Sequence, residues 1–296
     1  MILTFQKLAY KITLKDTFFL SLGFSSFFFL NNKNSILSFF PHLISNKKAF
    51  ALRNDPNFKN NRETKREFFE KKDTQALLSK YPDLHILNLK TVELLIGQIR
   101  DKNTSMEDFR NISKRLIRLI LEETFAYECT EEVIKESPLG LYKTFCNPNK
   151  FSDYIAISIL RSGNSMTDEI LSLAPGISIG TVMIQRDENT EQKLPIFFFE
   201  KLPNQLENKK ILVLDPMLAT GGTASTTIDI LIRRGVKPTD IVFVNIISCE
   251  EGIDNLFNQF PGIRLVTALV DPYLLPNKYI APGIGDFGDR YYGTMD

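Results

Sequence analysis

Short apolar runs alternate with amphipathic segments through the second half of this sequence, and that alternation constrains the fold most. The run YIAISIL at Tyr154–Leu160 is typical of a strand buried on both faces, and Ser165–Leu173 is typical of a helix. The remaining predicted strands are Ser178–Gln185, Pro195–Glu200, Ile211–Leu214, Ile241–Ile247 and Arg264–Val270, and the remaining helices Ala224–Arg234 and Gly252–Phe260. Such a series predicts an α/β fold with a mostly parallel central sheet flanked by helices.

A longer helix is predicted upstream of this alternating region. Thr104 and Glu107 have the spacing of a capping box, in which two side chains satisfy the first free N–H groups of a helix. Apolar residues then recur at helical spacing from Phe109 to Phe125. We therefore expect one amphipathic helix that runs to about Tyr127.

Composition divides the chain near residue 80, and we expect an extension over 1–80 and a folded domain over 81–296. Residues 1–54 hold ten of the 24 phenylalanines and seven Lys or Arg, but only one acidic residue, Asp16. A basic, acid-poor segment of this kind is typical of targeting peptides. A disordered, lineage-specific extension or a mis-assigned start codon is the alternative, and both stay open. Residues 55–75 are polar and highly charged, as in a linker or a surface helix.

Charge and side-chain chemistry exclude several classes of function. The formal net charge of +1 gives no field that would draw the chain to nucleic acid or to an anionic membrane, so a site for a polyanionic small molecule has to be built locally. Three widely spaced cysteines argue against a zinc site or a disulfide framework. The two histidines, His42 and His85, are expected to lie outside the catalytic part, which argues against histidine acid–base chemistry.

The same inventory bears on the compartment. The longest apolar candidate, Phe18–Leu30, has 13 residues, whereas a spanning helix needs about 20. We therefore expect no membrane association and a cytoplasmic location, with organellar targeting by residues 1–54 left open.

The segment Ile211–Leu231 carries the clearest chemical pattern. A strand ends before Asp215, a turn follows with Ala219, Thr220, Gly221, Gly222 and Thr223, and a helix then begins. Glycines permit close backbone approach, and the helix N-terminus offers N–H groups and partial positive charge, so the turn is suited to a phosphate. An ordinary helix-start turn with Thr caps is the alternative. No Lys follows the second glycine, which excludes a Walker A loop, and the spacing is not G-x-G-x-x-G.

Four blocks in order resemble the uracil phosphoribosyltransferase family, over roughly Leu84–Thr294. Asp215–Thr223 (DPMLATGGT) resembles the loop that binds phosphoribosyl diphosphate (PRPP), and Tyr279–Thr294 (YIAPGIGDFGDRYYGT) resembles the uracil-binding loop. Ile157–Met166 resembles the block that carries a diphosphate-binding arginine, with Ser162 where the family has Ala. Met183–Pro203 resembles a flexible hairpin that closes over PRPP.

The resemblance implies a type I phosphoribosyltransferase fold and the transfer of phosphoribose from PRPP to uracil, giving UMP and pyrophosphate. It assigns catalytic roles to Asp215, Arg186 and Asp286. The implied PRPP-binding residues are Arg161, Arg186, Asp215, Pro216, Met217, Leu218, Ala219, Thr220, Gly221, Gly222, Thr223 and Asp286. The implied uracil-binding residues are Ile280, Gly285, Asp286 and Phe287. It also implies Mg²⁺ held mainly through PRPP, without a protein ligand set, GTP as an effector, and a homodimer or homotetramer.

Three other functions are weighed against this one. A catalytically silent homologue on the same fold would have lost part of the pocket, whereas the motif residues are all present here. An RNA-binding regulator would need a basic face, and 36 Lys and Arg against 35 Asp and Glu give no sign of one. A fused kinase activity would need the Walker A loop that the chain lacks.

Overall fold

The computed structural model describes residues 73–129, 131–145, 151–186 and 195–294. The chain divides between Glu67 and Phe68, and every described residue belongs to the second unit, Phe68–Asp296. The predictions for residues 1–54, and nearly all of the segment 55–75, lie outside the described residues. The second unit includes helix α5 (Gln75–Lys80), which precedes the domain start predicted at residue 81.

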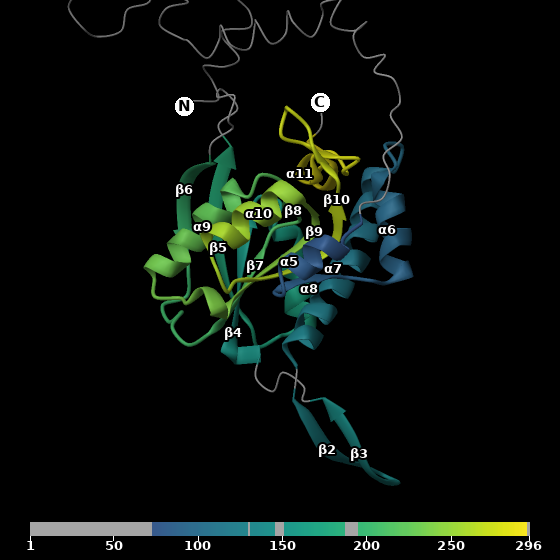
Figure 1. Cartoon of the computed structure of the whole chain (residues 1–296), viewed down its shortest axis with the longest axis vertical. Helices are drawn as coiled ribbons and strands as arrows, with labels where there is room; N and C mark the ends of the chain where they lie inside the picture. Colours follow the sequence, from purple (N-terminus) through teal and green to yellow (C-terminus); the bar gives the residue numbers. More distant parts are fainter. Residues whose placement is uncertain (1–72, 130, 146–150, 187–194, 295–296) are drawn as a thin grey trace, which may run out of the picture. The chain divides into compact units, whose positions relative to one another are not determined.

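The second unit is built on an eight-stranded sheet in the order β1-β10-β9-β7-β4-β5-β6, with β8 paired to β9 (Figure 1). Only the β5–β6 pair is antiparallel, so the predicted mostly parallel sheet is confirmed. Its strands are β1 (Leu84–Ile86), β4 (Tyr154–Leu160), β5 (Ser178–Arg186), β6 (Pro195–Lys201), β7 (Lys210–Leu214), β8 (Met217–Leu218), β9 (Ile241–Cys249) and β10 (Arg264–Asp271).

Helices cover both faces of this sheet because alternate residues of each buried strand point to opposite sides. In β7, Leu212 and Leu214 pack with α6 (Lys90–Arg100), α7 (Met106–Glu128) and α8 (Asn164–Leu173). Ile211 and Val213 pack with α9 (Gly222–Arg233) and α10 (Glu250–Gln259) on the other face. The expected helical layers on both sides are therefore present.

Smaller elements complete the described chain. Strands β2 (Glu132–Ser137) and β3 (Gly140–Phe145) form a two-stranded antiparallel hairpin, and β11 (Tyr273–Leu274) pairs with β12 (Ile280–Ala281). Short 3-10 turns occur at Phe151–Asp153 and Pro238–Asp240, and α11 (Phe287–Tyr292) lies near the C-terminus. Among the described residues, none of the helices has the length and apolar content that crossing a membrane requires.

Two local predictions are wrong. The cap of α7 is Ser105, whose hydroxyl accepts from the Asp108 N–H at 3.1 Å, while Thr104 donates to the Gln98 carbonyl at 2.6 Å. The box is therefore displaced by one residue, because the hydroxyl one position later is the one with extended cap geometry. His85 does not lie outside the catalytic domain, since it is part of β1 in the central sheet.

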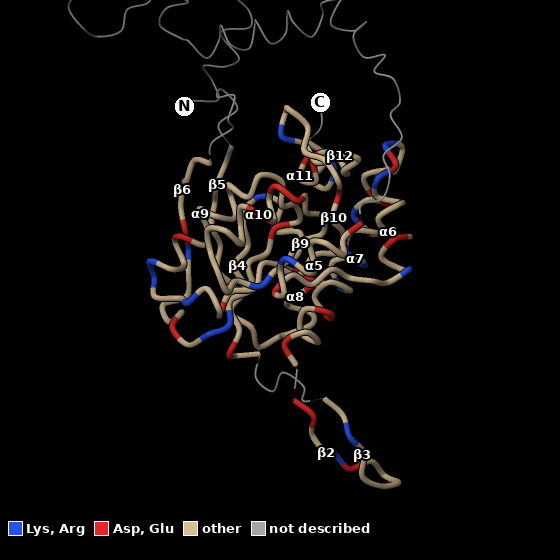
Figure 2. The backbone as a smooth tube through the Cα atoms, in the orientation of Figure 1, with Lys and Arg blue, Asp and Glu red and all other residues tan. Residues whose placement is uncertain are grey.

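Charged residues of both signs are interspersed along the described backbone (Figure 2). This distribution accords with a net charge of +1. Selective binding of an anion therefore has to come from the local placement of a few groups.

Candidate active site

The sheet has a topological switch point between β4 and β7. The chain leaves β4 through α8 toward β5 on one side, and it leaves β7 through α9 toward β9 on the other. Ligands of open α/β sheets bind in the crevice that opens at such a point, outside the carboxyl ends of the strands. Arg161 follows β4 through a cis peptide bond, and Asp215 follows β7, so both stand at this crevice.

The predicted phosphate loop continues along β9 before it turns into α9. The Pro216 carbonyl accepts from the N–H groups of Ile246 and Ile247, at 2.9 and 3.1 Å, and the following strand β8 pairs with β9. Gly221 occupies the cap position of α9 with φ of 84°, a left-handed conformation that favours glycine. The loop thus delivers the N-terminus of α9, whose first N–H groups have no partner within the helix, to the crevice.

The start of α10 braces this loop from behind. A side chain at Gly252 would place its Cβ 2.4 Å from the Ala219 carbonyl oxygen, so only glycine allows this approach. Asn255 donates to the Thr220 carbonyl at 2.9 Å, and the Cys249 thiol to that of Ala219, also at 2.9 Å. Burial raises the pKa of the Cys249 thiol, which keeps it in the donating form. None of these three residues was predicted as part of the site.

The C-terminal block forms a second loop with tight backbone geometry. Gly283 and Gly285 have φ of 58° and 75°, and a Cβ on Gly283 would meet the Ile280 carbonyl oxygen at 2.1 Å. Ile280 and Phe287 are buried, whereas Asp286 is exposed and caps α11 by accepting from the Asp289 N–H at 2.9 Å. We call residues 279–287 the base loop.

Two arginines hold the base loop in place. Arg100 of α6 makes a bidentate ion pair with Asp271 at 2.5 and 2.9 Å, and the Asp271 carboxylate also accepts from the Gly283 N–H at 2.9 Å. Arg290 donates to the carbonyls of Ile284, at 2.8 Å, and of Asp101 and Ile99 near the end of α6. Burial lowers the pKa of this Arg290 guanidinium. The loop is therefore tied to the end of α6, which lies far away in the sequence.

A cavity of about 440 Å³ lies between the two loops at the crevice. Nine residues predicted for the site line it: Arg161, Asp215, Met217, Ala219, Thr223, Ile280, Gly285, Asp286 and Phe287. The predicted residues that do not line it are Pro216, Leu218, Thr220, Gly221 and Gly222, which shape the loop through their backbone. Arg186 ends β5 next to the lining residue Gln185, but its side chain and the hairpin residues 187–194 lie outside the described structure.

Sequence reasoning missed one cation in this cavity. Lys278 lines the wall, has a positive φ of 67°, and lies 4.0 Å from the carboxylate of Glu251. Its position just before the base loop, in a turn without apolar periodicity, offers only a weak signal. The described cations of the cavity are thus Arg161 and Lys278.

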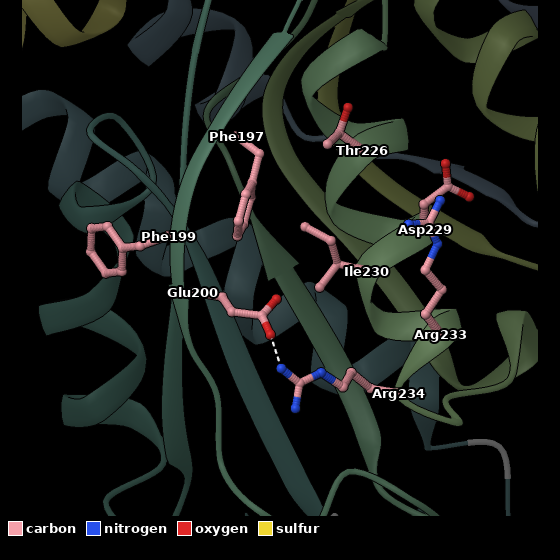
Figure 3. A pocket seen from close by; sticks show the side chains of 8 residues that line it. All are labelled: Phe197, Phe199, Glu200, Thr226, Asp229, Ile230, Arg233 and Arg234. Atoms are coloured by element: carbon pink, nitrogen blue, oxygen red, sulfur yellow. Dashed lines mark hydrogen bonds and ion pairs between the residues drawn. The ribbon is translucent and has the colours of Figure 1, made fainter.

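A larger cavity of about 640 Å³ lies elsewhere, between β6 and α9 (Figure 3). Phe197, Phe199 and Glu200 line it from the strand, and Glu200 is ion-paired with Arg234 at the end of α9. No residue predicted for the site lines this cavity. We therefore assign the site to the smaller cavity, where the loops at the strand ends meet.

Comparisons with known proteins identify the family of this chain. The sequence model of the family described as uracil phosphoribosyltransferase matches residues 86–294. The uracil phosphoribosyltransferase of Saccharomyces cerevisiae is 40% identical over 218 residues, which are 73% of this chain and 99% of the relative. That of Dictyostelium discoideum is 39% identical over 219 residues, with the same coverage of both chains.

A solved structure shows the same fold. A protein from Aquifex aeolicus superposes with a TM-score of 0.60 and 27% identity, over 71% of this chain and 97% of the other. The match to the family covers the whole alternating region and both loops of the cavity. The chain belongs to the uracil phosphoribosyltransferase family.

Proposed function

We propose that this chain transfers the 5-phosphoribosyl group of PRPP to uracil, giving UMP and pyrophosphate. One observation carries the proposal: the loop after β7 and the base loop line the same cavity. A sugar phosphate held at the first loop and a flat base held at the second would therefore meet within one pocket. Family relatives named for this activity match over almost their whole length.

The arrangement suggests a role for each group toward PRPP. Residues 219–223 and the N-terminus of α9 hold the 5-phosphate, and Asp215 accepts from the ribose hydroxyls. Arg161 and Arg186 bind the diphosphate. Sites of this kind accelerate reactions by positioning and by electrostatic stabilisation of the leaving group, without covalent catalysis.

The chemistry of the cavity fits a magnesium ion that binds mostly through the substrate. The carboxylates of Asp215 and Asp286 line the same space, while the described residues include no group of three or more His, Cys, Asp and Glu placed to hold a metal. Mg²⁺ commonly keeps several waters and binds through substrate phosphates and one or two carboxylates. Asp215 and Asp286 are the protein groups that would contact it, and the ion would neutralise diphosphate charge.

The reaction exchanges one bond at the anomeric carbon. The C1–O bond to diphosphate breaks with its electron pair leaving on oxygen, uracil N1 bonds to C1 from the opposite face, and the N1 proton is released. The base loop selects uracil through main-chain groups that match its O2, N3–H and O4 edge. Cytosine reverses two of these positions, and each unpaired buried group would disfavour it by about 1–3 kcal/mol.

A radiolabel assay tests the proposal. Purified protein with PRPP, Mg²⁺ and labelled uracil should form UMP, and Arg186→Ala and Asp286→Ala should each lose most of that activity. Arg233→Ala, in the larger cavity, is the control and should retain activity. A folded protein that makes no UMP would be the silent homologue, whereas near-normal rates in both site variants would remove the site assignment.

The family resemblance also predicts activation by GTP and a homodimer or homotetramer, and the residue inventory predicts a cytoplasmic location, with organellar targeting by residues 1–54 left open. The rate of UMP formation with and without GTP tests the first. Sedimentation of the purified chain tests the second, and microscopy of the full chain tests the third.

A further inference from the structure

We propose that Asp289 is a positioning residue that orients Arg161 for the diphosphate of PRPP. The inference rests on the proposed function, which gives Arg161 that role. The Arg161 Nη2 donates to Asp289 Oδ1 at 2.7 Å, across 128 residues of sequence. Asp289 belongs to α11, directly after the base loop.

The carboxylate reaches the guanidinium from outside the cavity. Arg161 lines the cavity, whereas Asp289 and Tyr292 are absent from the described residues that line it. The Tyr292 ring lies 5.4 Å from the Arg161 Cζ, and its hydroxyl donates to the Arg161 carbonyl at 3.3 Å. Side chain and backbone of Arg161 are thus both held from the side away from the substrate.

Asp289 is itself held in place. Its Oδ1 accepts from the Thr294 hydroxyl at 2.6 Å, and its N–H donates to the Asp286 carboxylate. The helix packs closely here, because a Cβ on Gly288 would lie 3.1 Å from the Ser162 hydroxyl and 3.5 Å from Arg161 Nη2. A fixed acceptor can therefore select one orientation of the arginine.

The contact is suited to orientation rather than to holding the fold. The Arg161 and Asp289 side chains are 52% and 40% exposed, and ion pairs as exposed as this contribute little to stability. Ordering one long side chain before binding changes affinity by about 3- to 10-fold. The same helix begins in the base loop, so the two halves of the pocket share one support.

Steady-state kinetics of four variants test this role: Asp289→Asn, Arg161→Ala, their double variant, and Glu122→Gln as control. Glu122 forms a similarly exposed ion pair with Arg118 on α7, and neither residue lines the cavity. We expect Asp289→Asn to raise the KM for PRPP, and to weaken inhibition by diphosphate, by about 3- to 10-fold. The KM for uracil and the melting temperature should stay as in Glu122→Gln.

The double variant separates positioning from direct binding. If Asp289 acts through Arg161, Asp289→Asn should add nothing to the loss already caused by Arg161→Ala. Tyr292→Leu, which removes the other contacts to Arg161, should shift the KM for PRPP in the same direction. It also serves as the test variant if Asp289→Asn does not fold.

The kinetics distinguish failure of the inference about Asp289 from failure of the role proposed for Arg161. An unchanged KM for PRPP in Arg161→Ala would overturn the role given to Arg161 in the proposed function. A raised KM in Arg161→Ala with an unchanged or lowered KM in Asp289→Asn would leave that role intact and overturn the inference. A lowered value would mean that Asp289 competes with the diphosphate for the arginine.

Discussion

Replacement of Gly252 by alanine tests how far the phosphate loop depends on the helix behind it. The added Cβ would lie 2.4 Å from the Ala219 carbonyl oxygen and 2.9 Å from that of Leu218, both backbone atoms that no rotamer change can move. Ordinary van der Waals contacts begin at 3.4 Å, so the Cβ and the Ala219 oxygen must move apart by about 1 Å. The loop, α10 or both must therefore move.

The expected magnitude follows from two opposed effects. Alanine in the first turn of α10 gains about 0.5–1 kcal/mol over glycine in helix propensity, whereas overpacking costs about 1–3 kcal/mol. We therefore expect a net loss of stability of about 1–2 kcal/mol. Because a misplacement of about 1 Å can lower a rate by about 100-fold, UMP formation should fall far more than stability does.

The assay compares kinetics and urea unfolding with Gly97→Ala as the matched control. Gly97 also lies inside a helix, α6, but a Cβ added there would meet no neighbouring atom within 4 Å. Alanine there should stabilise the protein and leave activity unchanged. If Gly252→Ala matched Gly97→Ala in both measurements, the reasoning that α10 fixes the phosphate loop would be refuted.

Three further variants probe the support of the base loop and the sheet. Arg290→Met should lower the free energy of unfolding in urea by about 3 kcal/mol or more, because buried carbonyl groups would lose their hydrogen-bond donor. A loss below about 1 kcal/mol would contradict this. Asp271→Asn removes the partner of Arg100 and should raise the KM for uracil more than that for PRPP; equal shifts would argue against a loop-specific effect. Burial lowers the pKa of His85 below its ordinary 6.5, against a weaker opposite effect of Glu123. As the pH falls, the unfolded chain therefore binds this proton before the folded chain does. The contribution of His85 to the free energy of unfolding is full above about pH 6.5 and should decline as the pH falls toward the pKa in the folded state. His85→Gln should flatten this decline, and an unchanged urea profile would contradict the assignment.

The sequence predicted the central sheet well because its strands are buried on both faces. Tyr154–Leu160 was predicted with its observed bounds, because this apolar-rich run of seven residues is followed by the charged Arg161. Most other bounds moved by one or two residues, where caps decide the end of an element. The three-residue β1, the six-residue α11 and the exposed hairpin of β2 and β3 were not predicted, because short or solvated segments carry no period.

The site, like the fold, was predicted only in part. Its two loops were predicted because each is a contiguous block, but the residues that brace them come from distant segments. Arg100 looks like an ordinary charge in the sequence, and only the fold brings it to Asp271 and the base loop. Arg290 lies within the predicted block, but its partner Ile99 lies 191 residues away. Gly252 did offer a signal, since glycine in the first turn of a helix often marks a close backbone approach.

The bracing of the base loop has a consequence for how the protein is made. Arg290 donates to Ile99 across 191 residues, and Arg100 to Asp271 across 171. Closing such long chain segments is among the late and entropically costly steps of folding. During synthesis the domain can assemble most of its sheet while the nucleobase pocket is still missing. Competence to bind uracil then arises only once residues 280–290 have left the ribosome.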